Sequence, residues 1–252
     1  MFEGIKDKRV LITGASGGMG AAFAELFADY GARLGLHYAK NEDEASRLLA
    51  SVRRKGTEAK IFKADLLRSE EITKLANSFI KKFGGIDVLI NNAGAVFDQI
   101  DFRELEEKSW QNTFDLNVKA PFLLSRFVFD VMKDHGGGRI INLSSVNVKY
   151  GGSAKSMHYV ASKAALESIT RTFAKEGAKY KILVNAIRPG VIDTPMRTKI
   201  AGYTKEDFEK RVAIVPLKRA GKPIDVARMA LFLASEAGNF ITGEVFTVAG
   251  GD

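Results

Sequence analysis

The stretch "VLITGASGGMG" at residues 10–20 joins a short apolar run to a glycine-rich turn. The apolar run has the length and branched side chains of a buried strand, and the residues after the turn follow a helical pattern. Glycines let a backbone approach a phosphate closely, and the free N–H groups that begin a helix attract one. The spacing Gly14-x3-Gly18-x-Gly20 departs from the common G-x-G-x-x-G. Alone it indicates either a phosphate-binding loop or a plain strand-to-helix turn.

The alternation of apolar runs and helical patterns continues outward from this stretch. Continuous rather than alternating apolar runs are typical of a parallel sheet that is covered on both faces. The pattern therefore predicts a doubly wound α/β fold with about seven strands, and no linker or repeat divides residues 1–252 into more than one domain. Strands are expected at 9–13, 33–38, 58–65, 86–94, 138–145, 182–190 and 244–251, and helices at 19–31, 42–56, 69–84 (capped by Ser69), 105–134, 157–179 and 223–234.

Composition narrows the classes of protein. The 252 residues include no Cys, which excludes disulfides, thiolate metal sites and a Cys nucleophile. The three His show no metal-ligand spacing, so no metal is expected. The net charge of +8 suits acidic partners, but the basic residues are scattered and no nucleic-acid-binding motif is present. No signal peptide or membrane span is apparent, so we expect a cytoplasmic protein without a membrane partner.

A second informative stretch is "MHYVASKAAL" at residues 157–166. Tyr159 and Lys163 are four residues apart, which places them on one face of the expected helix. A free phenol has a pKa of about 10, and a nearby ammonium lowers the pKa by stabilising phenolate. The pair is therefore a candidate for general acid–base catalysis. The alternative is an interfacial Tyr beside a solvated Lys.

Together with further motifs, these stretches resemble the short-chain dehydrogenase/reductase family. The resemblance covers essentially the whole chain. It implies a Rossmann-type domain, a homotetramer, and hydride transfer between a nicotinamide cofactor and a carbonyl or secondary alcohol. The motifs, in the family's order, are "TGASGGMG" (13–20), "NNAG" (91–94), "DLNVKAPF" (115–122), "NLSSV" (142–146), "YVASK" (159–163), "RPGVIDTPM" (188–196) and "ITGEVFTVAGG" (241–251).

The resemblance implies a catalytic set made of Asn117, Ser145, Tyr159 and Lys163. Tyr159 would give a proton to the carbonyl oxygen, and Ser145 would orient that oxygen. Lys163 would lower the pKa of Tyr159 and bind the nicotinamide ribose, while Asn117 would hold a water and Lys163 in a proton relay. Ser144 stays open as a second donor or as a hydroxyl that only caps the strand end.

The resemblance also implies cofactor contacts at the ends of several strands. "NNAG" could equally serve only to fix a turn, and Asp65 could serve only to begin a helix. The expected contacts are Gly14, Ser16, Gly17, Gly18, Met19 and Gly20 in the glycine loop, Asp65 and Leu66 after the third strand, Asn91, Asn92, Ala93 and Gly94 after the fourth, Tyr159 and Lys163, and Pro189, Gly190, Ile192 and Thr194 after the sixth.

The end of the second expected strand bears on the choice between NAD and NADP. An acidic residue there would bind the ribose 2′-hydroxyl of NAD, but Tyr38 occupies the position and Lys40 follows. We therefore predict NADP, with Lys40 and His37 near its 2′-phosphate and NAD as the alternative. Gly17 departs from this pattern, because many NADP-using relatives have a basic residue there.

Residues 195–215, which include Met196, Ile200, Tyr203 and Phe208, are expected to form a substrate flap. Within the family the chain most resembles β-ketoacyl-acyl-carrier-protein reductases, and sugar or polyol dehydrogenases come next. The substrate would then be an acyl thioester or another small carbonyl compound, and the positive charge would suit an acidic acyl carrier protein. A non-catalytic NADP sensor would have lost the Tyr, Lys or Ser, and none is lost. A nucleic-acid binder would need steep salt dependence.

Overall fold

The computed structural model describes residues 2–194 and 204–252. Within them seven parallel strands form one sheet, in the order β3-β2-β1-β4-β5-β6-β7. The chain winds outward in one direction from β1 and in the other from β4, so the predicted doubly wound parallel fold is confirmed. The strands are β1 (Arg9–Ile12), β2 (Arg33–Tyr38), β3 (Ala59–Lys63), β4 (Val88–Asn91), β5 (Gly138–Leu143), β6 (Ile182–Pro189) and β7 (Val245–Val248).

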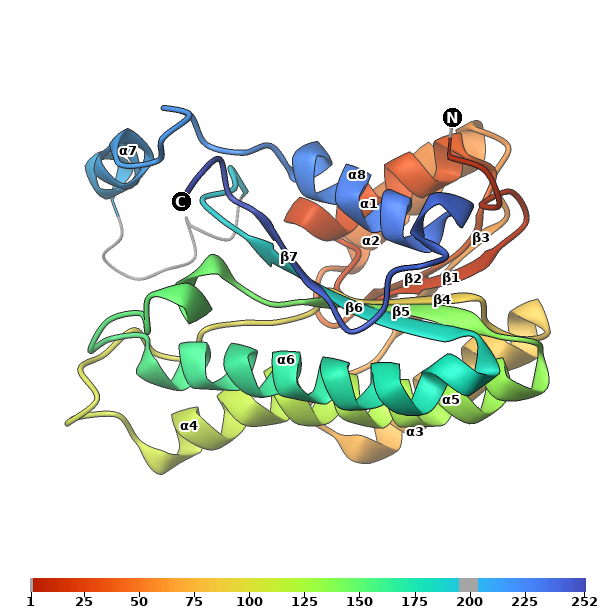
Figure 1. The fold of residues 1–252 in the computed structure, drawn as a ribbon, viewed down its shortest axis with the longest axis horizontal. Helices are drawn as coiled ribbons and strands as arrows, with labels where there is room; N and C mark the ends of the chain where they lie inside the picture. Colours follow the sequence, from red (N-terminus) through yellow and green to blue (C-terminus); the bar gives the residue numbers. More distant parts are fainter. Residues whose placement is uncertain (1, 195–203) are drawn as a thin grey trace.

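Helices cover both faces of this sheet (Figure 1). Helices α1, α2 and α8 lie on one face, and α3, α5 and α6 lie on the other. The helices are α1 (Gly18–Asp29), α2 (Glu42–Arg54), α3 (Ser69–Phe83), α4 (Glu107–Phe114), α5 (Ala120–Asp134), α6 (Met157–Gly177), α7 (Lys205–Ala213) and α8 (Pro223–Ala234), with short turns η1 (Asp115–Lys119), η2 (Val146–Lys149), η3 (Ala178–Tyr180) and η5 (Glu236–Gly238).

Two apolar cores hold these layers together. Successive residues of a strand point to opposite faces, so Ile12 packs under α1 and α8 while Leu11 packs under α3 and α5. Both side chains are fully buried. Burial on both faces explains why the strands appear in the sequence as continuous apolar runs.

The expected element boundaries are mostly close, and the expected cap of α3 is wrong. The ranges 33–38 and 223–234 match β2 and α8 at both ends. Ser69 does not cap α3, because Arg68 holds the cap position and its carbonyl already accepts the N–H groups of Glu71 and Ile72.

The long helical region expected at 105–134 is present. It begins at Glu107, and a π-helical turn, η1, divides it into α4 and α5. A π turn adds a residue to the helix and often marks a functional position. The buried side chain of this turn is Asn117.

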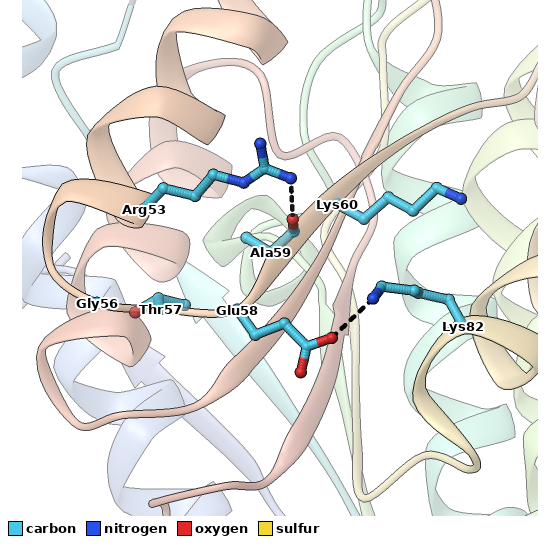
Figure 2. Close-up of a pocket in the computed structure, with 7 residues that line it drawn as sticks. All are labelled: Arg53, Gly56, Thr57, Glu58, Ala59, Lys60 and Lys82. Atoms are coloured by element: carbon cyan, nitrogen blue, oxygen red, sulfur yellow. Dashed lines mark hydrogen bonds and ion pairs between the residues drawn. The ribbon is translucent and has the colours of Figure 1, made fainter.

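A shallow hollow of about 420 Å³ lies at the outer edge of the sheet, at the amino-terminal end of β3 (Figure 2). The Arg53 side chain donates to the Ala59 carbonyl there at 2.9 Å, and Lys82 pairs with Glu58 at 2.8 Å. In a parallel sheet this end lies opposite the loops that follow β1 and β4. The hollow is therefore separate from the site described next.

Candidate active site and cofactor cleft

The loops that follow β1 and β4 are joined at the point where the winding of the sheet reverses. The Thr13 hydroxyl accepts the N–H groups of Asn92 and Ala93, both at 3.0 Å. The Asn92 side chain donates to the carbonyls of Thr13 at 2.8 Å and Gly14 at 3.0 Å. Such a switch point is where open α/β sheets bind ligands. Sequence reasoning missed Thr13, although a hydroxyl at the last residue before Gly14 was the available signal.

The glycine loop is shaped as a cradle for an anion. Gly14 and Gly18 adopt φ values of 63° and 52°, which side chains disfavour. A Cβ on Gly20 would lie 2.2 Å from the Gly14 carbonyl oxygen. Helix α1 starts with Gly17 at its cap, and neither a side-chain cap nor an acidic first turn satisfies its N–H groups. These features fit a pyrophosphate.

The segment after β6 lies opposite this cradle. Thr194 has its Cβ 3.3 Å from the place that a Cβ on Gly18 would take. Gly190 donates to Val248 at 3.0 Å, and Ile192 is buried in a bridge with Gly221. The expected residues Thr194 and Gly18 are therefore brought together across the cleft.

His37 does not face a phosphate, which corrects our expectation. It is 2% exposed, and both ring nitrogens have partners. Nδ1 accepts the Gly14 N–H at 3.0 Å, and Nε2 lies 3.0 Å from the Ala64 carbonyl. Burial lowers the pKa of His37 to about 4, against the opposing effects of Ala64 and Asp65. The ring is therefore neutral near pH 7, and it holds the glycine loop by accepting the Gly14 N–H.

The other residues expected around the adenosine of the cofactor lie at or beyond the carboxyl ends of the strands. Lys40 is exposed, whereas Tyr38 is buried. The pKa of Tyr38 is raised by burial and by a hydrogen bond to Glu42. The Asp65 carboxylate accepts the Leu67 N–H at 3.0 Å, which is a turn-forming contact, and Leu66 packs in the core. Ser16 and Met19 are half-buried in the glycine loop and the start of α1.

Asn91 does not line the cleft, which corrects a second expectation. It is the last residue of β4, it is 2% exposed, and it points into the layer below the sheet. Its amide nitrogen donates to Asn142 at 2.8 Å and to Ser125 at 3.1 Å. Asn92 and Ala93, rather than Asn91, therefore contact the glycine loop.

Tyr159, Lys163 and Ser145 meet where α6 crosses the end of β5. The Tyr159 hydroxyl and the Ser145 side chain share a hydrogen bond. The Lys163 ammonium lies 5.8 Å from the centroid of the Tyr159 ring and donates to the Leu143 carbonyl at 2.7 Å. The sequence could not indicate Leu143, because its contribution is a backbone carbonyl.

The electrostatics of this group differ from the expectation. Burial raises the pKa of Tyr159, and only the hydrogen bond to Ser145 opposes that rise. Burial also lowers the pKa of Lys163 to about 8. The Lys163 ammonium is directed at the Leu143 carbonyl. Lys163 therefore does not lower the pKa of Tyr159, contrary to the expectation. Both groups hold a proton near pH 7.

Asn117 reaches this site from η1. Its oxygen accepts the Ala95 N–H at 3.0 Å, and its nitrogen donates to the Ala95 carbonyl at 2.9 Å and to Ser162 at 3.0 Å. A Cβ on Gly94 would lie 2.9 Å from the Asn117 oxygen and 3.0 Å from Lys163 Nζ. Asn117 and Lys163 therefore flank Gly94, and only a glycine fits between them.

The expected substrate flap is described only in part. Met196, Ile200 and Tyr203 lie outside the described residues, whereas Phe208 belongs to α7. Thr204 and Asp207 form a capping box at the start of α7, with bonds of 3.1 Å and 2.9 Å.

The described ranges, 2–194 and 204–252, contain no cluster of His, Cys, Asp and Glu that could hold a metal ion. None of their helices is long and apolar enough to cross a membrane.

Comparisons with known sequences match nearly the whole chain to reductases. A family model described as enoyl-(acyl carrier protein) reductase matches residues 14–252. The chain is 34% identical over 245 residues to a 3-oxoacyl-(acyl-carrier-protein) reductase of Staphylococcus epidermidis, covering 97% of this chain and 98% of that one. It is 35% identical over 249 residues to the reductase of the same name from Thermotoga maritima, covering 98% of each.

Solved structures also superpose on nearly the whole chain. A blue fluorescent protein from a metagenomic library, in complex with NADPH, superposes with a TM-score of 0.90 at 31% identity, covering 98% of each chain. A 7α-hydroxysteroid dehydrogenase with NADH and 7-oxo glycochenodeoxycholic acid has a TM-score of 0.90 at 32% identity, covering 98% of this chain and 94% of that one. Levodione reductase has a TM-score of 0.92 at 28% identity, covering 98% of this chain and 97% of that one.

Proposed function

Since the chain belongs to the short-chain dehydrogenase/reductase family, we propose that it is an NADP-dependent reductase of 3-oxoacyl thioesters. The observation that carries this proposal is the joining of Ser145, Tyr159 and Lys163 beside a glycine cradle for a pyrophosphate. The product is a secondary alcohol, and the same site works in both directions.

The nicotinamide supplies the hydride when it is bound, and the chain supplies binding, orientation and a proton. Gly14, Gly18 and Gly20, with the start of α1, would hold the pyrophosphate. The protonated Tyr159 gives its hydroxyl proton to the carbonyl oxygen, to which the Ser145 hydroxyl also donates a hydrogen bond.

The reduction itself is the first test. Acetoacetyl-CoA should oxidise NADPH faster than NADH. Tyr159→Phe should keep NADPH binding and lower the turnover rate by a factor of about 10² to 10⁴, as removal of a general acid does. Unchanged turnover in this variant would remove Tyr159 from the mechanism.

The substrate bond is tested by a matched pair of thioesters. The family model is named for reduction of an enoyl double bond, whereas the two relatives are named for reduction of a 3-oxo group. A hydroxyl pair aimed at one oxygen suits a C=O bond. Crotonyl-CoA should therefore be reduced far more slowly than acetoacetyl-CoA, and the reverse order would make the protein an enoyl reductase. Reaction with neither would favour a sugar or polyol substrate.

The preference for NADP rests on Lys40 and on the lack of an acidic residue at position 38. An exposed ammonium beside a 2′-phosphate contributes about 1 kcal/mol, so Lys40→Ala should weaken NADPH binding about fivefold and leave NADH binding unchanged. Lys74→Ala, which removes an exposed ammonium from α3, is the control. Equal weakening of both cofactors in Lys40→Ala would refute the assignment.

The remaining parts of the proposal concern partners and location. The net charge of +8 supports docking of an acidic acyl carrier protein that carries the substrate. We also propose a homotetramer, which is supported by exposed apolar side chains such as Phe122 and Phe240. We also propose a cytoplasmic location, which would suit reduction of carrier-bound thioesters with NADPH. The substrate flap at 195–215 and the single domain at 1–252 remain part of the proposal.

A further inference from the structure

One face of α6 carries three chemically active side chains at intervals of four residues: Tyr159, Lys163 and Glu167. Side chains at this spacing lie one above another on a helix. Tyr159 and Lys163 belong to the proposed mechanism, whereas Glu167 has no part in it. Glu167 is nevertheless 3% exposed, so it is not a solvated surface residue.

This face of α6 meets three consecutive residues at the end of β5. Because the three are consecutive, a contact that fixes the second also limits where the third can lie. The contacts are Lys163 Nζ to the Leu143 carbonyl at 2.7 Å, Ser144 Oγ to Glu167 Oε1 at 2.6 Å, and the Tyr159 hydroxyl to Ser145.

Ser144 and Ser145 therefore have different partners. Ser144 is 4% exposed, and its hydroxyl donates to Glu167, on the side away from the phenol. Neighbouring residues of an extended segment point to opposite sides. The hydroxyl that is left to face Tyr159 is that of Ser145.

Arg188, from β6, balances the charge of Glu167. Its Nε donates to Oε1 at 2.6 Å and its Nη2 donates to Oε2 at 2.5 Å, so the pair is bidentate. The hydrogen bond to Glu167 raises the pKa of Arg188. A buried ion pair seldom stabilises a fold more than apolar side chains of the same size would. Stability alone therefore does not account for this pair.

We propose that Glu167 is a positioning residue, which acts with Arg188 through Ser144 to hold Ser145 opposite Tyr159. This inference rests on the proposed function, because it gives that site its support. Glu167 touches neither substrate nor cofactor in this role. It holds the end of β5 against α6, in the same way that Lys163 does one turn earlier.

A change in the charge of the Glu167–Arg188 pair should shift the pH at which Tyr159 titrates, and a purely structural role would not cause this shift. Glu167→Gln leaves the Arg188 guanidinium unbalanced, which favours phenolate and lowers the pH at which Tyr159 titrates. Arg188→Gln leaves a buried carboxylate unbalanced, which disfavours phenolate and raises that pH. The double variant restores neutrality, so its titration should return towards that of the unmodified protein.

The experiment compares these three variants with Asp87→Asn. Asp87 forms another bidentate pair, with Arg9, at the amino-terminal ends of the central strands β1 and β4. Tyr159 is followed by the ultraviolet difference between phenol and phenolate, after subtraction of the Tyr159→Phe spectrum. We expect shifts of about half a pH unit or more, in opposite directions for the two single variants and absent in Asp87→Asn.

Kinetics with acetoacetyl-CoA give the second readout. Glu167→Gln should lower kcat about tenfold and leave the Kd for NADPH within about twofold, because the loss is one of placement. Ser144→Ala should cause a similar loss, and the double variant should lose little more, because both act through one contact.

The outcomes separate the inference from the proposed function. If Glu167→Gln only lowers the unfolding temperature, as Asp87→Asn does, with kcat and the Tyr159 titration unchanged, the positioning role is refuted. If the unmodified protein reduces no thioester, the proposed function fails, and the titration still decides whether Glu167 and Arg188 act on Tyr159.

Discussion

His37 links a single buried imidazole to the shape of the cofactor loop. Its pKa of about 4 lies below its ordinary value of 6.5, so the folded chain binds this proton less readily than the unfolded chain does. The stability it contributes is complete above pH 6.5 and is lost as pH falls towards 4. Mild acid should therefore lower the free energy of unfolding while the ring in the folded chain stays neutral and keeps its contact with Gly14.

His37→Asn tests this at the scale of one residue. Asn keeps an acceptor for the Gly14 N–H and has no proton to gain. Between pH 7.5 and pH 4.5 the unmodified protein should lose about 2 to 3 kcal/mol more unfolding free energy than the variant does, measured by urea denaturation. Equal losses would show that His37 is not held neutral in the fold.

The spacing of four residues was enough to pair Tyr159 with Lys163, and the family resemblance was needed to add Ser145. They were not enough to place His37 or Asn91, because a strand residue can point to either face of the sheet. Both lie in strands that are buried on both sides, where alternation gives no sign of direction. Their orientation followed only from the partners, Gly14 and Asn142.

At the scale of elements, the crossing of β1 and α1 depends on Gly20. An added methyl group would meet the backbone of Gly14 at 2.2 Å and of Ala15 at 2.8 Å, and backbone atoms cannot move aside cheaply. Gly20→Ala should therefore weaken NADPH binding about 100-fold or more and lower stability by about 1 to 3 kcal/mol.

The control for that prediction is Gly84→Ala, at the end of α3. Gly84 has a φ of 77° and no atom within 4 Å of an added Cβ. Alanine there should cost about 1 kcal/mol through backbone strain, with NADPH binding retained. NADPH titration and urea denaturation of both variants separate the two effects. Equal NADPH binding by both would show that the close approach at Gly20 is not required.

Helix α8 and strand β2 were predicted to the residue, whereas η1 was missed. A π turn changes the helical period by one residue within five, which is too short for a periodic pattern to reveal. Its buried side chain makes a tertiary contact, from Asn117 to Ala95, and no local sequence rule contains that contact.

At the scale of the whole molecule, the net charge of +8 predicts electrostatic attraction to an acidic carrier protein that delivers the substrate. Attraction between a basic enzyme and an acidic carrier is screened by salt. Raising the salt concentration from 0.05 to 0.5 M should increase KM for a thioester on acyl carrier protein by about tenfold or more. An uncharged short thioester is the control, and its KM should change little. Equal salt dependence would argue against carrier docking.

The two edges of the sheet differ in a way that limits how molecules of this protein can associate. Lys60 and Lys63 are exposed on the edge strand β3, and Arg53 and Lys82 stand beside it (Figure 2). A strand that approached this edge would meet the charged side chains of Lys60 and Lys63, which are a common protection against strand addition. The opposite edge, β7, has apolar side chains and no Lys or Arg. Pairing of two sheets through the β7 edge would therefore join two copies and could not propagate into a filament.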